Sequence, residues 1–151
     1  MIKLKRTDSQ DQDFIELVKH LDADLAIRDG DDHAFYNQFN SINMIKFAIV
    51  VYEDSVPIGC GAIKVFDDER MEVKRMYVVP DHRGKGVASR ILKALELWAI
   101  ELGYKRCVLE TGINQPEALA LYHKSGFSRI ANYGQYVNVQ SSFCFEKVLK
   151  S

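Results

Sequence analysis

Residues 83–86, Arg-Gly-Lys-Gly, place two basic side chains and two glycines at the start of an amphipathic stretch. The unpaired N–H groups at the N-terminus of a helix carry a partial positive charge and attract anions. Glycine has no Cβ, so its backbone can approach a ligand oxygen closely. These residue types at this spacing predict a turn that binds a phosphate group.

Two known phosphate-binding motifs can be compared with this turn. A Walker P-loop requires Gly-Lys-Ser/Thr, whereas Gly86 follows Lys85 here, so this motif is excluded. The dinucleotide fingerprint G-x-G-x-x-G is matched by Gly84 and Gly86, but Ser89 stands where the third glycine belongs. Because Glu110 lies near the sequence distance of a ribose-binding acid, a dinucleotide-binding module stays open as an alternative.

Cysteine and histidine residues form no ligand pattern. The three cysteines, Cys60, Cys107 and Cys144, each lie in an apolar run without the C-x-x-C spacing of a zinc site. The four histidines are scattered along the chain. We therefore expect no metal, and we expect the cysteines to be buried free thiols in a reducing compartment.

Composition indicates the general class of the protein. The chain has 151 residues, of which 47% are hydrophobic and 27% charged, with a net charge of -1. This predicts a single domain over residues 1–151 and gives no electrostatic attraction to nucleic acid or to an anionic membrane. No apolar run approaches the roughly 20 residues that cross a membrane, and residues 1–5 do not begin a signal peptide. We expect a cytoplasmic protein.

Periodicity predicts the first half of the fold. A strand at residues 2–6 precedes a helix that Thr7, Asp8 or Ser9 could cap and that carries apolar residues between positions 14 and 25. A shorter helix is expected around residues 34–43. Three β-rich runs at 47–54, 56–66 and 70–79, separated by short connections, predict an antiparallel meander.

The second half has a different pattern. A helix at 84–102, ended by Gly103, leads to a buried strand at 106–111, and such a strand–helix–strand unit makes the two strands parallel. Pro116 suits the first turn of another helix, which Gly126 ends. Strands follow at 127–130 and 141–149. The predicted fold is α+β, an antiparallel meander followed by a parallel βαβ crossover.

Two motifs within this order of elements resemble one known family. Residues 83–88, RGKGVA, match R/Q-x-x-G-x-G/A, and residues 121–127, LYHKSGF, match Leu-Tyr-x-x-x-Gly-Phe. Residues 71–80, MEVKRMYVVP, resemble the fourth strand of the same family. The chain thus resembles the GNAT superfamily of acyl-CoA-dependent N-acetyltransferases. The resemblance implies a mixed, centrally splayed β-sheet flanked by about four helices, with acetyl-CoA as co-substrate.

The resemblance also assigns cofactor-binding residues. Pantetheine would bond to the backbone of the strand, and the pyrophosphate would bond to the N–H groups of the turn. The family carries an asparagine seven residues before its tyrosine; Gln115 stands there, next to Asn114, so either amide could contact the cofactor. The resulting cofactor-binding residues are Met76, Tyr77, Val78, Arg83, Gly84, Lys85, Gly86, Val87, Ala88, Ser89, Asn114 and Gln115.

Three residues are candidates for the chemistry, which is direct attack of an amine on the thioester. Glu72 lies where many family members carry the general base and is preferred here. Glu110 lies where certain other members carry theirs, and a reaction without a protein base is the third option. Tyr122 matches the tyrosine that protonates the departing CoA thiolate.

The acceptor is the least determined part. Acidic residues between positions 21 and 32 could attract a cationic amine, whereas Arg28, Lys74 and Arg75 could bind the carboxylate of an amino-acid-like acceptor. Tyr133 and Tyr136 are candidates for the wall of the acceptor site. We expect a small primary amine rather than a protein, and a homodimer is possible. The alternative function is a catalytically silent acyl-CoA-binding or sensing domain.

Overall fold

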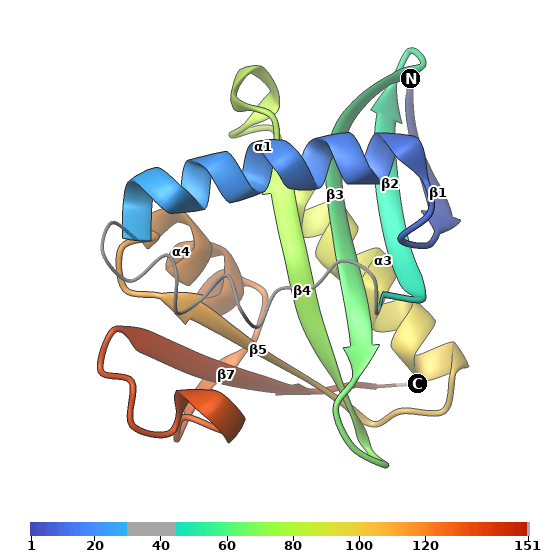
Figure 1. The fold of residues 1–151 in the computed structure, drawn as a ribbon. Coiled ribbons are helices and arrows are strands. Elements are labelled where there is room, and N and C mark those ends of the chain that lie inside the picture. The colour runs from blue at the N-terminus through green and yellow to red at the C-terminus, as the bar shows by residue number, and fades with distance from the viewer. Residues whose placement is uncertain (30–44, 151) are drawn as a thin grey trace.

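The computed structural model describes residues 1–29 and 45–150, which form one mixed sheet with helices on both faces (Figure 1). The strands are β1 (Ile2–Thr7), β2 (Phe47–Glu53), β3 (Val56–Val65), β4 (Arg70–Val78), β5 (Arg106–Gly112), β6 (Ser128–Ile130) and β7 (Ser142–Val148). The helices in these residues are α1 (Gln12–Asp29), α3 (Val87–Glu101) and α4 (Pro116–Lys124), with 3-10 turns η3 (Pro80–His82) and η4 (Gly134–Tyr136). The helix expected around residues 34–43 lies outside the described residues.

The strand order is β1-β2-β3-β4-β5-β7-β6, and β4–β5 is the parallel pair of this sheet. The predicted meander β2-β3-β4 is antiparallel, and α3 connects β4 to the parallel strand β5. Both expectations are confirmed. A dinucleotide-binding fold is built from repeated parallel βαβ units, so that alternative does not fit this topology.

The sheet opens between its parallel strands. Residues Arg70, Met71 and Glu72 of β4 pair with residues 106–108 of β5, and the described register ends there, although β4 continues to Val78 and β5 to Gly112. Figure 1 shows the two strands diverging from this point. The centrally splayed sheet that the resemblance implies is therefore confirmed.

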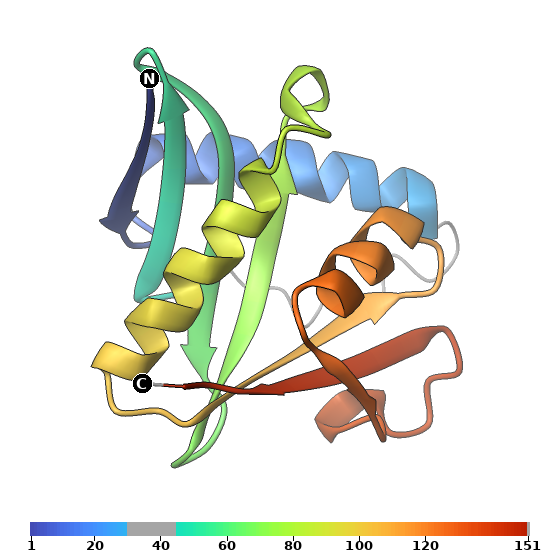
Figure 2. The ribbon, with the colours of Figure 1, turned by 180° about the vertical axis from the view of Figure 1, so that it is seen from behind.

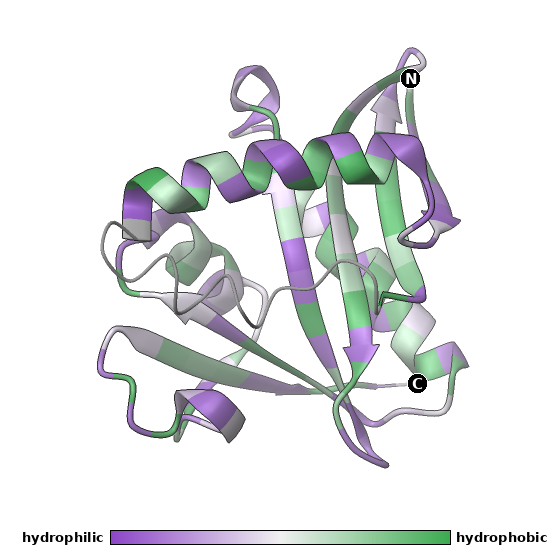
Figure 3. Ribbon diagram, in the orientation of Figure 1, coloured by the Kyte–Doolittle hydropathy of each residue, from purple (hydrophilic) through white to green (hydrophobic). Residues whose placement is uncertain are grey.

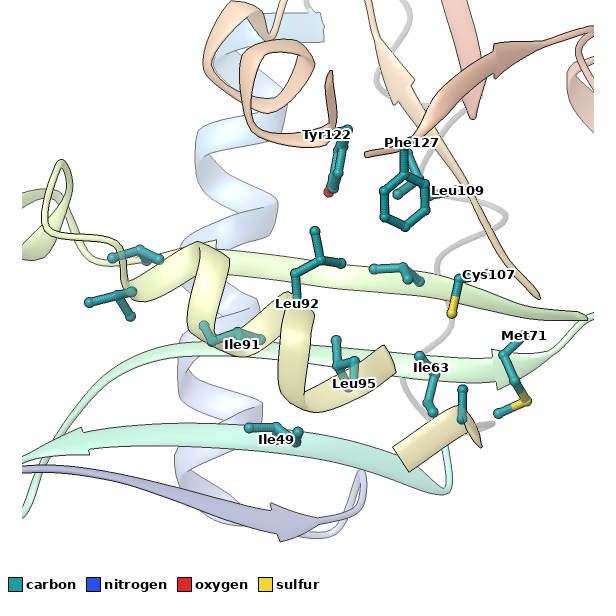
Figure 4. Close-up of a cluster of buried hydrophobic side chains, with 14 of the residues drawn as sticks. Ile49, Ile63, Met71, Ile91, Leu92, Leu95, Cys107, Leu109, Tyr122 and Phe127 are labelled. Carbon is teal, nitrogen blue, oxygen red and sulfur yellow. The ribbon is translucent and has the colours of Figure 1, made fainter. Parts of the chain in front are cut away.

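The two faces of the sheet bury separate apolar clusters. Helix α1 covers one face, whereas α3 and α4 lie on the other (Figures 1 and 2). Ile91, Leu92 and Leu95 of α3 pack on Ile63 and Met71 of the sheet (Figure 4). The cluster under α1 contains Phe14, Leu17, Val18, Ile45, Ala48, Val50, Cys60 and Ala62. Along β4, hydrophilic residues alternate with hydrophobic ones (Figure 3), so one face of this strand is polar.

Two helix starts differ from the sequence expectation. The cap of α1 is Asp11, whose Oδ1 accepts a hydrogen bond from the Phe14 N–H at 3.0 Å, rather than Thr7, Asp8 or Ser9. Helix α3 begins at Val87 rather than at residue 84, because Gly84 and Gly86 take φ values of 76° and 80°. As expected, the three cysteines are free and buried.

Candidate active site

A cleft of about 630 Å³ lies where β4 and β5 diverge. Its walls come from α1, β4, the turn at residues 82–89, β5 and α4. The predicted residues that line it are Glu72, Glu110, Tyr122, Met76, Tyr77, Val78, Arg83, Gly84, Gly86, Val87, Ala88, Ser89, Gln115, Arg28, Lys74 and Tyr136. Lys85, Asn114 and Tyr133 do not line it. The fold thus gathers residues 21–28, residues 72–89, residues 110–124 and Tyr136 around one opening.

The glycine turn presents the N-terminus of α3 to this cleft. Gly86 is the N-cap, no side chain caps the helix, and its first turn contains no acidic residue. The backbone N–H groups there are thus open to an anion. Arg83 is held at the strand end, because its Nε donates to the Val78 carbonyl oxygen at 2.8 Å and its guanidinium lies 5.5 Å from the centre of the Tyr77 ring.

The two candidate amides have different environments. Asn114 Nδ2 donates to the carbonyl oxygen of Arg28 at 3.2 Å and so ties the end of α1 to the segment before α4. Gln115 occupies the N-cap position of α4 and lines the cleft. The position in the cleft favours Gln115 for a cofactor contact.

Glu72 is almost fully buried, with 8% of its surface exposed. The Tyr133 hydroxyl donates to its Oε2 at 2.7 Å, and Lys74 Nζ lies 3.7 Å from its Oε1. Burial, followed by the Glu72 charge, raises the pKa of Tyr133, so this phenol keeps its proton and remains a donor. Burial lowers the pKa of Lys74 despite the nearby carboxylates. Tyr133, although outside the cleft lining, thus acts on the cleft through Glu72.

Glu72 and Glu110 lie on the same face of the sheet. Glu72 pairs with Val108, and Glu110 follows Val108 by two residues, the period at which side chains return to one face. This is the face that α1 covers, because Lys74, two residues after Glu72, pairs with Ala62 of the cluster under α1. Tyr136 lies near both carboxylates, and burial, followed by the Glu110 charge, raises its pKa.

Tyr122 approaches the cleft from the opposite face. It belongs to the cluster under α3, where its ring centre lies 5.8 Å from that of Phe127 and 6.3 Å from that of Phe145 (Figure 4). Burial raises the pKa of its hydroxyl, with a smaller effect from Glu110, so the phenol is protonated at neutral pH. Glu72 and Glu110 therefore reach the cleft from one face of the sheet, and Tyr122 reaches it from the other.

Arg28 makes a contact that sequence spacing did not reveal. Its Nη1 donates to Glu117 Oε2 at 2.9 Å and its Nη2 to Glu117 Oε1 at 2.5 Å, so a two-fold ion pair joins the end of α1 to the start of α4. Glu117 was missed because 89 residues separate the partners. The sequence showed Glu117 only as an acidic residue in the first turn of α4, which does not identify its partner.

His82 also lines the cleft. Its side chain is 27% exposed, and its Nε2 lies 3.7 Å from Glu53 Oε2 on β2. Among residues 1–29 and 45–150 no helix is long and apolar enough to cross a membrane. In the same residues, no three His, Cys, Asp or Glu side chains form a group that could hold a metal ion.

Comparisons with known proteins agree with this geometry. The model of the acetyltransferase (GNAT) family matches residues 14–127. An IAA acetyltransferase from Azospirillum brasilense is 37% identical over 106 residues, which span 70% of this chain and 69% of that protein. For some other curated relatives the match covers half of their length or less.

Solved structures share the whole fold. One from Klebsiella pneumoniae subsp. pneumoniae MGH 78578, assigned as an acyl-CoA N-acyltransferase, superposes with a TM-score of 0.84 at 29% identity, over 99% of both chains. A GNAT family acetyltransferase from Elizabethkingia anophelis with acetyl-CoA bound has a TM-score of 0.73 at 19% identity, over 98% of both chains, which shows the fold alone. With the family model matching most of its length, the chain belongs to the acetyltransferase (GNAT) family, the acetyl-CoA-dependent N-acetyltransferases.

Proposed function

We propose that this N-acetyltransferase moves an acetyl group from acetyl-CoA to a small primary amine by direct attack in a ternary complex. One observation carries the proposal: the cleft lies where β4 and β5 no longer pair with each other, and it is lined from both faces of the sheet. A thioester and an amine can then approach the same point from opposite sides. No covalent enzyme intermediate is needed.

The donor would follow β4 toward the glycine turn. Its pantetheine arm would bond to the backbone of Met76, Tyr77 and Val78 at the open edge of the strand. Its pyrophosphate would accept hydrogen bonds from the N–H groups of residues 84–89, with the basic side chains of Arg83 and Lys85 beside it. Gln115, rather than Asn114, would contact the cofactor from the opposite wall.

Glu72 is the proposed general base. A lysine-like amine has a pKa near 10.4, so its deprotonation at pH 7 costs about 5 kcal/mol unless the protein assists. The Glu72 carboxylate is buried beside the cleft and held by the Tyr133 hydroxyl, which fixes its direction. Glu110 on the same face is the alternative. Arg28, Lys74 and Tyr136 would form the wall around the acceptor.

Tyr122 would protonate the departing CoA thiolate. Tyr122 lines the cleft from the α4 side, and its hydroxyl holds a proton at neutral pH. A thiol with a pKa of ~8.5 is a tolerable leaving group by itself. Loss of this hydroxyl should therefore slow the reaction rather than abolish it.

The cysteines do not offer a covalent route. Burial raises the pKa of Cys107 to about 12 and that of Cys144 to about 11, and it also raises the pKa of Cys60. A thiol is a weak nucleophile when it is protonated. Cys60→Ala and Cys107→Ala should keep turnover; if either abolished it while CoA affinity and folding were intact, direct attack would be refuted.

The first experiment is thermal unfolding with acetyl-CoA, CoA, NAD and ATP in parallel. A ligand at one hundred times its Kd stabilises the protein by about 2.7 kcal/mol, which should raise the Tm by about 5–10 °C at this chain length. We expect a response to acetyl-CoA and CoA. A screen of primary amines by thiol release then separates an enzyme from a silent acyl-CoA-binding domain, which would bind the donor without turnover.

The choice of base is tested by a matched pair of variants. Glu72→Gln should lower kcat and change its pH dependence while the affinity for CoA stays nearly the same. Glu110→Gln, on the same face of the sheet, is the control and should affect kcat less. The opposite order would assign the base to Glu110, and unchanged pH profiles in both would assign proton removal to water.

The proposal also includes a homodimer and a cytoplasmic location. Gel filtration of the full chain tests the homodimer. The cytoplasmic location is tested by fractionation of cells that express the chain.

A further inference from the structure

Arg75 has an unusual backbone conformation in the middle of β4. Its φ is 61°, in the left-handed region that residues with a Cβ rarely adopt. The register between β3 and β4 shifts here, because Cys60 pairs with Tyr77 whereas Ala62 pairs with Lys74. Gly61 therefore faces two residues of β4, and the resulting bulge turns Arg75 toward α1. Such local strain persists where the surrounding structure holds it, often at ligand sites.

The guanidinium of Arg75 is buried with donors to spare. Its side chain is 3% exposed, and Nη1 donates to Asp22 Oδ1 of α1 at 2.9 Å. Within residues 1–29 and 45–150 the Nε is buried without a hydrogen-bond partner. A guanidinium has five N–H donors arranged as a fork, and a buried donor without a partner is costly. The edge of the fork that contains Nε is thus available for an acceptor that residues 1–29 and 45–150 do not provide.

Arg75 belongs to the acceptor side of the cleft. Arg75 lines the cleft together with Glu72 and Lys74 on the face that α1 covers. Arg28 lies in the same cleft, but Glu117 already occupies both of its terminal nitrogens. Lys74 lies 3.7 Å from Glu72, and burial favours its neutral form. Arg75 is therefore a buried cation of this face that still has a donor available for a ligand.

We infer that Arg75 binds a carboxylate of the acceptor, so that the substrate is an amine carrying a carboxylate, as in an amino acid. The inference rests on the proposed N-acetyltransferase function and names its substrate class. Planar guanidinium and carboxylate groups pair through two parallel hydrogen bonds, a geometry that a primary amine without a carboxylate cannot use. The same pairing would orient the amino group toward Glu72, the proposed base.

The test compares amines that differ only in the carboxylate. Alanine and ethylamine, phenylalanine and phenethylamine, and lysine and cadaverine are assayed by thiol release from acetyl-CoA with the full chain. We expect at least a 10-fold higher kcat/KM for the carboxylate-bearing member of the pair that reacts best. Equal or better turnover of the amine that lacks the carboxylate would overturn the inference and leave the N-acetyltransferase function intact.

Variants locate the effect at the guanidinium. Arg75→Gln should remove the preference, because KM should rise more for the amino acid than for its decarboxylated partner, with the Kd for CoA unchanged. Arg75→Lys, which keeps a cation in the site, is the second variant if Arg75→Gln does not fold, and it should keep only part of the preference. An equal loss for both members of a pair, or a weaker affinity for CoA, would overturn the inference.

If no amine reacts, the proposed function is refuted. The carboxylate site can then still be tested by a binding measurement. The CoA-saturated protein is then unfolded thermally with N-acetylglycine or with N-ethylacetamide, which lacks the carboxylate. Stabilisation by N-acetylglycine alone, lost in Arg75→Gln, would support the carboxylate site. An equal response to both compounds, or none, would overturn it.

Discussion

Substitution of Gly86 by alanine separates the conformational role of this glycine from its role in binding. Gly86 has a φ of 80°, and an added Cβ would meet no protein atom within 4 Å. Protein sterics therefore give no reason for a loss of cofactor affinity. The cost to the fold is the left-handed backbone, about 1–2 kcal/mol for a residue with a Cβ.

The matched control is Gly103, which ends α3 at its other end. Its φ is 92°, and its Cβ would likewise meet nothing within 4 Å, but Gly103 does not line the cleft. Gly103→Ala should thus carry the same backbone strain without a change at the site. At about 2–4 °C per kcal/mol for a chain of this size, both variants should lose about 2–8 °C in Tm.

Only Gly86→Ala should weaken CoA binding. The new Cβ would keep the pyrophosphate from the N–H groups of the turn, and one hydrogen bond to a charged group contributes about 1.5–3 kcal/mol. We therefore expect Kd for CoA to rise about 10- to 150-fold, since each 1.4 kcal/mol is a factor of ten. Calorimetric titration of both variants with CoA is the measurement. Wild-type affinity in Gly86→Ala, at the same Tm loss as Gly103→Ala, would refute the assignment of the turn.

Three further changes test other parts of the structure. Tyr133→Phe removes the hydroxyl that holds the Glu72 carboxylate in position, so kcat should fall while the Kd for CoA stays unchanged; an unchanged kcat would show that the hydrogen bond has no catalytic role. Arg28 lowers the pKa of Glu117 from 4.5 to about 2, so their ion pair stabilises the fold above pH ~4.5 and loses this effect as the pH falls toward 2. The Tm of Glu117→Gln should therefore fall less between pH 5 and 2 than that of the wild type, and parallel curves would contradict the pairing. Gly61→Ala would place a Cβ 2.7 Å from Ile91 Cγ2 and should cost about 1–3 kcal/mol, measured by urea unfolding; unchanged stability would mean that α3 can move away from the strand.

The sequence by itself predicted most features that depend on local spacing, although not the cap of α1 or the first residue of α3. The glycines and basic residues at 83–86 define a turn and a helix start wherever the rest of the chain lies, because φ preference and unpaired N–H groups are local properties. The change from a meander to a βαβ unit predicted the parallel pair, which the register at Glu72 and Val108 confirms.

Only the tertiary structure decided which side chains meet. Tyr133 reaches Glu72 across 61 residues, and Arg28 reaches Glu117 across 89, through loop paths and packing that no local pattern encodes. The bulge at Arg75 depends on how β3 and β4 align, and a shift of one residue changes the face that a side chain occupies. The glycine turn is thus set by local sequence, whereas the pairing of the charged side chains in the cleft is set by strand register and packing.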